Sequence, residues 1–287
     1  MKMIDAKKEK EYTTVAYAHI AYALAQLDLA HPSFFMSAMT CITRHIRTIS
    51  LRSLSLLAWA YAKSELDHQL RGPVIRDAFN MMAERVMAHV AHADPEIITR
   101  VMWAFATLQL QNTALFKTIA AECLTTRARL ERFDDQELCL LASSFGRLHH
   151  LNEALFARIA DLASTQIHHY TPPRLQMLAV GFSEVGVKNE TLLHLIAEQI
   201  LQKKMTTFSS RQLVIMAGVF ATFQIQNPAF MTELSRHFRE YIALILPVDL
   251  ASLAHSFATL RIQDEVFFLF LLFYFLFFIF YFLFFIF

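Results

Sequence analysis

The sequence predicts an all-α protein, a right-handed α-solenoid of about seven helix-hairpin repeats of ~38 residues followed by an apolar C-terminal helix. Three observations predict this fold class. The 287 residues include five Gly and seven Pro, which leaves little material for the tight turns of a sheet protein. One short segment recurs seven times at nearly even spacing. Within each copy, apolar residues follow the 3.6-residue period of an amphipathic helix.

The recurring segment has the pattern LAxxFA, and its first apolar residue serves here as a marker. The copies read IAYALAQL, LAWAYAKS, VMWAFATL, LASSFGRL, LAVGFSEV, MAGVFATF and LAHSFATL. Their markers are Ile20, Leu57, Val101, Leu141, Leu178, Met216 and Leu253, separated by 37, 44, 40, 37, 38 and 37 residues. A small residue follows the marker in six of the seven copies, and an aromatic residue stands four positions after it in six of seven. These positions predict a core shared between neighbouring repeats.

Helix starts are predicted seven positions before each marker. The residues there are Thr13, Ser50, Asp94, Asp134, Thr171, Ser209 and Leu246. Six of these seven are good N-caps, because a side-chain oxygen can accept a hydrogen bond from a free N–H of the first helical turn. Proline follows directly at positions 95, 172 and 247, where its missing N–H costs nothing.

A polar link and a second amphipathic segment follow each marker helix, as in ALFKTIAAECL and ALFARIADLAS. The longer second repeat carries its insertion around residues 71–73. We therefore expect a charged N-terminal segment over residues 1–12 and a repeat array over 13–265, with repeats starting near 13, 50, 94, 134, 171, 209 and 246.

The C-terminal residues 266–287 read VFFLFLLFYFLFFIFYFLFFIF and carry no charge. Twenty-two apolar residues are long enough to cross a bilayer as a helix, so hydropathy predicts a membrane span or tail anchor. The alternative interpretation is an artefact of the gene model, since Phe, Leu, Ile and Tyr are encoded by T-rich codons. A membrane partner is expected only if this segment is genuine.

The segments SLLAWAYAKSEL, TRVMWAFATLQLQNTALFKTIA and ASLAHSFATLRIQDEVFF resemble the heptatricopeptide and octotricopeptide repeats of organellar RNA-binding proteins. Many such proteins end in a RAP domain, and the FAST-kinase-like proteins share the architecture; no RAP domain follows the repeats in this sequence. The resemblance covers residues 13 to about 268. It implies binding of single-stranded RNA in a mitochondrion or plastid, with roles in transcript or rRNA stabilisation, processing or translation alongside other proteins of an organellar RNA complex.

Four positions per repeat, at five and one before the marker and two and six after it, point away from the predicted core. Polar and aromatic residues at these positions could read RNA, with Arg and Lys contacting phosphates and aromatic rings stacking on bases. The candidates are Arg52, Trp59, Lys63, Arg100, Trp103, Gln136, Arg147 and Arg211. Two alternatives stay open: exposed positions vary because nothing constrains them, and the two Trp residues fill space between repeats.

Enzyme chemistry is not indicated. The chain contains no Gly-rich phosphate loop, HExxH, GxSxG or CxxC motif, and its three Cys residues form no disulfide pattern. The pairs 149–150 and 168–169 are adjacent histidines at hairpin ends, for which we expect solvated roles, and the acidic pair 134–135 is explained as a helix start. We expect no cofactor and no metal.

The net charge of +1 gives no strong overall attraction to nucleic acid, so any such binding must use local patches. The N-terminus lacks both a signal-peptide apolar run and an Arg-rich transit segment, so we expect either no import or a missing true start. Alternatives to RNA binding are a HEAT-like protein-interaction scaffold, which the repeat length allows, and a membrane-anchored helical protein.

Overall fold

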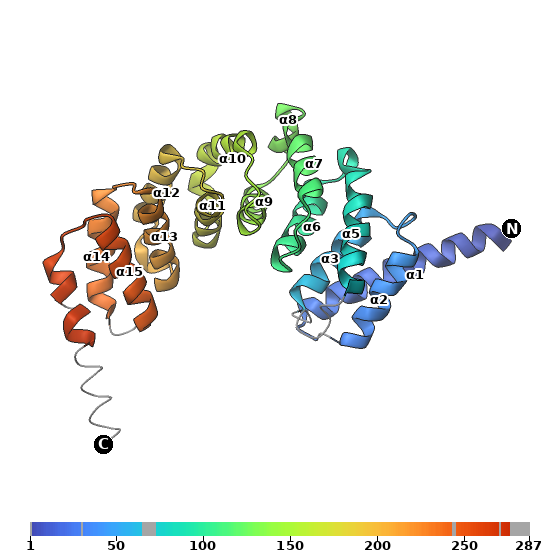
Figure 1. Ribbon diagram of the computed structural model, residues 1–287, viewed down its shortest axis with the longest axis horizontal. Helices are drawn as coiled ribbons and strands as arrows, with labels where there is room; N and C mark the ends of the chain where they lie inside the picture. Colours follow the sequence, from blue (N-terminus) through green and yellow to red (C-terminus); the bar gives the residue numbers. More distant parts are fainter. Residues whose placement is uncertain (1, 30, 65–72, 243–244, 270, 276–287) are drawn as a thin grey trace, which may run out of the picture. The chain divides into compact units, whose positions relative to one another are not determined.

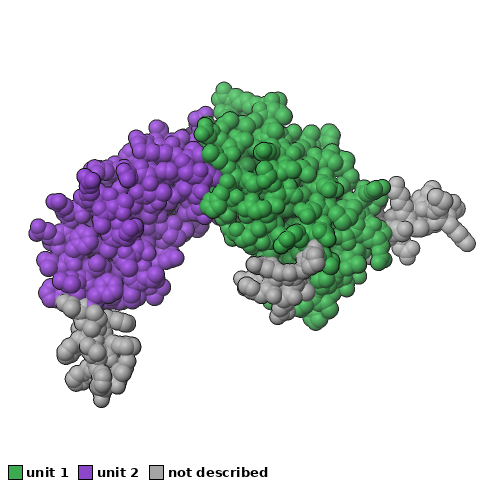
Figure 2. Space-filling view, in the orientation of Figure 1, with its two compact units in different colours: residues 1–159 green, residues 160–287 purple. Residues whose placement is uncertain are grey.

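All regular elements of the described chain are helices, which confirms the predicted all-α class (Figure 1). The computed structural model describes residues 2–29, 31–64, 73–242, 245–269 and 271–275. The chain divides into two compact units, Met1–Ile159 and Ala160–Phe287, coloured separately in Figure 2. Each unit consists of two layers of helices, one formed by the marker helices and one by the helices that follow them.

In unit 1 the marker helices pack one against the next in chain order. They are α1 (Lys2–Gln26), α3 (Leu51–Lys63), α6 (Pro95–Thr107) and α9 (Asp135–Arg147). The second layer contains α2 (Pro32–Arg44), α5 (Pro73–Met87) and α7 (Thr113–Leu124), which also pack in order. Two short helices, η1 (Val90–His92) and α8 (Arg127–Glu131), precede marker helices, and α10 (Glu153–Gln166) begins in unit 1 and ends in unit 2.

Unit 2 repeats the arrangement. Its marker helices α11 (Pro172–Val185), α13 (Ser210–Phe223) and α15 (Pro247–Thr259) pack in order, and α12 (Glu190–Lys203) packs against α14 (Pro228–Tyr241) behind them. The short helices η2 (Ile167–His169) and η3 (Met205–Thr207) precede α11 and α13. Residues 265–269 and 271–275 are helical and follow α15.

The marker and aromatic positions form the core, as predicted. Side chains at six markers are fully buried: Leu57, Val101, Leu141, Leu178, Met216 and Leu253. The aromatic residues four positions later are at most 1% exposed: Tyr61, Phe105, Phe145, Phe182, Phe220 and Phe257. The prediction was wrong for the first marker, because Ile20 is 48% exposed on α1, where no described helix pair packs before it.

The predicted positions place six of the helix starts correctly, five of them at residues predicted as N-caps and one at Leu246. Ser50, Asp94, Asp134, Thr171, Ser209 and Leu246 each stand directly before a marker helix. The side chains of Ser50, Asp134 and Ser209 accept hydrogen bonds from the third helical N–H, whereas those of Asp94 and Thr171 do not. Thr13 was wrong as a cap: α1 starts at Lys2, because the preceding residues contain no Gly or Pro and include many Lys, Glu and Ala, which favour helix.

A second cap, which the sequence did not lead us to expect, starts the second helix in the last five repeats, whereas His31 at the same place in the first repeat makes no side-chain cap bond. Asn112, Asn152, Asn189 and Asn227 lie eleven residues after their markers, and Asp264 takes the same place in the last repeat. Each Oδ1 atom accepts a hydrogen bond from the N–H three residues later, at 2.9 to 3.1 Å. The residues that donate these bonds are buried leucines and phenylalanines, so the cap fixes where the second helix enters the core.

A left-handed residue ends the marker helix in every repeat whose link is described. It stands eight positions after the marker: Asp28, Gln109, His149, Gly186, Gln224 and Arg261, with φ between 53° and 75°. The N–H of the next residue donates to the carbonyl of the aromatic position, or of Leu24 in the first repeat, at 2.9 to 3.0 Å. This is a Schellman ending, and together with the Asn cap it gives successive hairpins the same turn.

No helix within the described part of the chain combines the length and the apolar character needed to cross a membrane. The predicted span over 266–287 falls partly outside that part, because residues 270 and 276–287 are not described.

The left-handed turn predicts opposite effects of two substitutions in unit 2. Gly186→Ala should lower the free energy of unfolding by about 1 kcal/mol, because an L side chain is strained at positive φ. The strain is purely of the backbone, since a Cβ at Gly186 would meet no atom within 4 Å. At the equivalent turn, Gln224→Gly should raise the free energy of unfolding by about 0.5–1 kcal/mol. Urea unfolding of the full chain measures both, and changes of the same sign would contradict the assignment.

The second cap predicts that Asn189→Ala lowers the free energy of unfolding by about 1 kcal/mol, because the N–H of Leu192 loses its acceptor. Thr171→Ala is the matched control: Thr171 also precedes a helix of unit 2 but makes no side-chain cap bond, so its loss should change stability much less. Equal effects of the two substitutions in urea titrations would show that the Asn side chain is not the stabilising group.

Candidate functional site

Seven of the eight predicted site residues lie on the marker-helix layer of unit 1. Arg52, Trp59 and Lys63 belong to α3, Arg100 and Trp103 to α6, and Gln136 and Arg147 to α9 or its first turn. Because these helices pack in order and the residues occupy equivalent positions, the side chains gather on one surface. The eighth residue, Arg211, lies on α13 in unit 2.

A groove of about 580 Å³ opens on this surface, with walls from α1, α3, α6 and the start of α9. We call it the aromatic groove. Trp59, Arg100, Trp103 and Gln136 line it, as predicted, together with Tyr22, Gln26, Glu96, Thr99, Asp134, Glu137 and Leu140. A second groove of about 550 Å³ adjoins it at Trp103 and includes Lys63 and Thr107.

Three aromatic rings from three successive repeats follow one another in the groove. The ring centroids of Tyr22 and Trp59 are 4.9 Å apart, and those of Trp59 and Trp103 are 5.9 Å apart with their planes inclined by 30°. All three stand two positions after their markers and are partly buried. Each Trp therefore packs against a ring of an adjacent repeat and also lines the groove, so the two interpretations of these residues are compatible.

Two cations lie over these rings. Lys63 Nζ is 5.4 Å from the centroid of the Trp59 ring, and the guanidinium carbon of Arg100 is 5.7 Å from that of Tyr22. Such contacts stabilise a cation over an aromatic face by roughly 0.5–1 kcal/mol at exposed sites. Lys63 also lies 3.5 Å from Gln26 Oε1 and 3.9 Å from Asp28.

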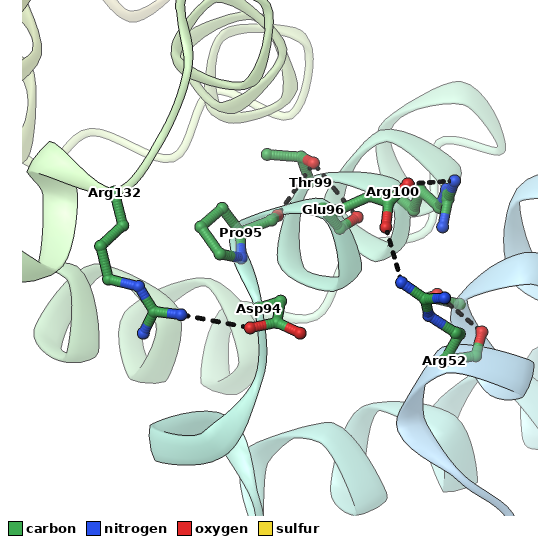
Figure 3. A network of polar contacts seen from close by, with 8 residues as sticks. Arg52, Asp94, Pro95, Glu96, Thr99, Arg100 and Arg132 are labelled. Carbon is green, nitrogen blue, oxygen red and sulfur yellow. Dashed lines mark hydrogen bonds and ion pairs between the residues drawn. The ribbon is translucent and has the colours of Figure 1, made fainter.

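One carboxylate, Glu96, holds two guanidinium groups on the groove wall (Figure 3). Its Oε1 accepts from Arg100 at 2.5 Å, within α6, and its Oε2 lies 3.5 Å from Arg52 on α3. The side chain of Arg52 is 67% exposed and that of Arg100 is 20% exposed. The predicted phosphate ligands are therefore already paired in this structure.

Asp134 and Glu137 form the far wall as a capping box. The N–H of Glu137 donates to Asp134 Oδ1 at 2.7 Å, and the N–H of Asp134 donates to Glu137 Oε2 at 2.9 Å. Burial raises the pKa of the Glu137 carboxyl, and the neighbouring carboxylates of Asp134 and Glu96 raise it further, against the lowering effects of the hydrogen bond and of Arg100. The capping box confirms the expectation that the acidic pair 134–135 begins a helix, because Asp134 is the N-cap of α9 and Asp135 is its first residue.

The remaining predicted cations lie beside the groove or apart from it. Arg147 on α9 donates to Thr107 Oγ1 of α6 at 3.3 Å, next to the second groove. Arg211 is 61% exposed and forms an ion pair with the buried carboxylate of Asp249 on α15. Arg211 thus has a partner inside unit 2, and the sequence alone did not indicate it.

The expectation of solvated histidine pairs holds only in part. His168 and His169 are exposed, but His150 packs its ring 4.3 Å from that of Phe116, and its Nε2 atom is buried. Burial lowers the pKa of His150, and nearby Lys117 lowers it further. The residue follows the left-handed turn position, which directs its side chain towards the second helix of the preceding repeat.

The chemistry of the aromatic groove suits flat, polar ligands. It offers stacked rings, two amide side chains and both signs of charge, because Arg52, Lys63 and Arg100 are balanced by Asp28, Glu96 and the capping-box carboxylates. Such a surface can stack a heterocycle and bond its edge. Tyr22 and Glu96 occupy the predicted outward positions but were not singled out, since neither their ring contact nor their ion pairs can be seen in the sequence.

Comparison with known proteins gives one family. No curated protein matches the sequence. Residues 29–203, more than half of the 287, match a family described as RNA-editing substrate-binding complex 6 protein. The match begins in the link after α1 and ends with α12, so it includes both Trp residues of the groove. The heptatricopeptide and octotricopeptide resemblance stays a prediction. By this match, the chain belongs to the RNA-editing substrate-binding complex 6 protein family.

Proposed function

We propose that this chain is a non-enzymatic protein that binds single-stranded RNA within an RNA-editing substrate-binding complex. The observation that carries the proposal is the row of three rings, Tyr22, Trp59 and Trp103, at equivalent positions of successive repeats. Modular reading of RNA requires such positions, and aromatic side chains are what unpaired bases stack on. The family description names an RNA-editing complex that binds substrate, which is consistent with this role.

In the proposed complex, bases enter the aromatic groove and the phosphate backbone passes along its rim. Stacking one base on an aromatic side chain is worth about 1–3 kcal/mol. Gln26 and Gln136 supply amide groups for base edges, while Arg52, Lys63 and Arg147 supply the cations nearest the rim. The balanced charge of the groove itself implies that its affinity comes more from stacking than from phosphate contacts.

We place this activity in an organelle, a mitochondrion or plastid, and in transcript or rRNA processing, stabilisation or translation, on the strength of the repeat resemblance. Other proteins of the complex are the proposed protein partners. Unit 2 favours such contacts, because Leu246, Val248, Leu272 and Phe273 are 55% to 69% exposed. These exposed apolar side chains are the observation that favours the scaffold role, in addition to RNA binding.

Base stacking can be tested through intrinsic fluorescence, because both tryptophans of the chain lie in the aromatic groove. Adding an unstructured single-stranded RNA should quench the tryptophan emission in step with binding. Trp103→Leu should weaken binding by about 5- to 150-fold, the equivalent of roughly 1–3 kcal/mol for one lost stack. Fluorescence anisotropy of labelled RNA measures the affinity independently.

Phe116→Leu, a substitution in the core away from the groove, controls for a general loss of packing. Circular dichroism should show both variants folded. RNA that binds without quenching tryptophan, or with the same affinity for Trp103→Leu as for the unchanged chain, would rule out the groove as the base-binding surface.

The ion-pair network predicts a gain of affinity. Glu96→Gln removes the carboxylate that holds Arg52 and Arg100, so both guanidinium groups become available to phosphates. RNA affinity should rise and its salt dependence should steepen, by roughly 0.7 in log–log slope for each phosphate gained on a single strand. Asp94→Asn is the matched control, because Asp94 pairs with Arg132 outside the groove. Unchanged or weaker binding of Glu96→Gln would contradict a phosphate role for these two arginines.

A further inference from the structure

Unit 2 concentrates positive charge at the edge where the chain passes from one hairpin to the next. The two links read QIHHYTPPR over residues 166–174 and QKKMTTFSSR over 202–211. Together they carry four cations, Arg174, Lys203, Lys204 and Arg211, two histidines and no Asp or Glu. The net charge of the whole chain is +1, so this excess of positive charge is offset by negative charge elsewhere in the sequence. We call these residues, with His168 and His169, the basic edge.

The fold brings the two links together. Lys203 Nζ donates to the carbonyl of His168 at 3.0 Å, which joins the end of α12 to η2. η2 packs against α12, and α11 packs against α13. Arg174 and Arg211 lie in the first turns of α11 and α13, so they also stand at this edge. The positive ends of both helix dipoles point the same way and add to the potential.

The cations of the basic edge are accessible. Lys204, Arg211 and both histidines are exposed, and the carboxylate that pairs with Arg211, Asp249, is only 4% exposed beneath it. The aromatic residues of the same links, Tyr170 and Phe208, are buried. The edge therefore offers charge and hydrogen-bond donors to a ligand, and the exposed rings of these two links are those of His168 and His169, whose centroids lie 3.9 Å apart.

The backbone at Lys204 supports a functional reading. Its φ of 66° and ψ of 133° lie in a region that residues other than glycine rarely adopt. Such strain persists only where the surrounding structure over-determines it, and it is concentrated at functional sites. Lys204 is such a residue, and its side chain is an exposed cation.

We propose that the basic edge of unit 2 binds the phosphodiester backbone of RNA, independently of base sequence. The proposal rests on the RNA-binding function proposed above and assigns it a second surface of different chemistry. The two links contain four cations and no Asp or Glu, which makes the edge complementary to a chain of phosphates. Tyr170 and Phe208 are buried and so supply no ring for base stacking, and the exposed positions of the two links include no large apolar residue that could enter a membrane.

The test uses the full chain and a labelled, unstructured single-stranded RNA, with affinity measured over a range of salt concentrations. Lys203→Gln combined with Lys204→Gln should reduce the slope of log affinity against log salt by about 1.4, since each phosphate contact on a single strand contributes roughly 0.7. At low salt the affinity should fall on the order of tenfold, equally for RNAs of different base composition. Lys188→Gln combined with Arg261→Gln removes the same charge from the opposite edge of unit 2 and should leave the slope nearly unchanged.

A single variant separates binding from folding. Lys204→Gly relieves the backbone strain while removing one cation, so the midpoint of thermal unfolding should rise while RNA affinity falls. A merely structural role for Lys204 would not give opposite changes.

The outcomes distinguish the two proposals. If the unchanged chain binds no RNA at low salt, the proposed function fails and the basic edge fails with it. If RNA binds and quenches tryptophan, but the double Lys variant keeps the affinity and salt slope of the unchanged chain, the basic edge is not an RNA contact. A loss of slope that is the same in the control pair would also overturn the proposal, because it would show a general charge effect.

Discussion

The structure depends on burial between neighbouring repeats. A single hairpin has apolar side chains on both of its faces, and only the next hairpin in the unit can remove the second face from water. Burying one Phe or Leu side chain is worth about 1.5–3 kcal/mol, and each marker helix after α1 contributes one marker and one aromatic residue to this shared layer. The exposed Ile20 on α1 is consistent with this dependence. It occupies the marker position of the first repeat, and no described helix pair precedes it to cover it.

Repeated burial alone would not line up a functional surface, because helices in a layer could rotate or slide. The left-handed residue eight positions after the marker and the Asn cap eleven positions after it remove this freedom. The first bonds the turn to the carbonyl of the aromatic position, and the second fixes the start of the helix that follows. Hairpins that carry both features therefore share one turn. In unit 1, the packing of α1, α3 and α6 in chain order brings the residues two positions after the marker together as Tyr22, Trp59 and Trp103.

The sequence predicted whatever is repeated and local. Six helix starts, five of them at predicted capping residues, the buried marker and aromatic positions, and the outward face with Trp59 and Trp103 follow from periodicity and capping chemistry alone. The predictions were wrong or missing where the structure depends on residues far apart in the sequence or on the N-terminal end of the chain. Arg52 is separated by 44 positions from Glu96 and Arg211 by 38 from Asp249, and no pattern within one repeat indicates such pairs. The start of α1 was misplaced because repetition suggested a boundary that the helix-forming residues before Thr13 do not respect.

Charge is distributed differently in the two candidate surfaces, and this difference has a consequence for specificity. In unit 1 the cations near the rings are paired with carboxylates. A phosphate would therefore add little binding free energy unless Arg52 and Arg100 left Glu96. In unit 2 the links at the basic edge contain four cations and no Asp or Glu, and their Tyr and Phe rings are buried. A surface rich in cations supplies affinity to any RNA, whereas a charge-balanced groove with stacked rings discriminates among ligands by shape and edge. If both proposed surfaces bind RNA, their separation keeps general phosphate attraction at the basic edge from masking the selectivity of the groove.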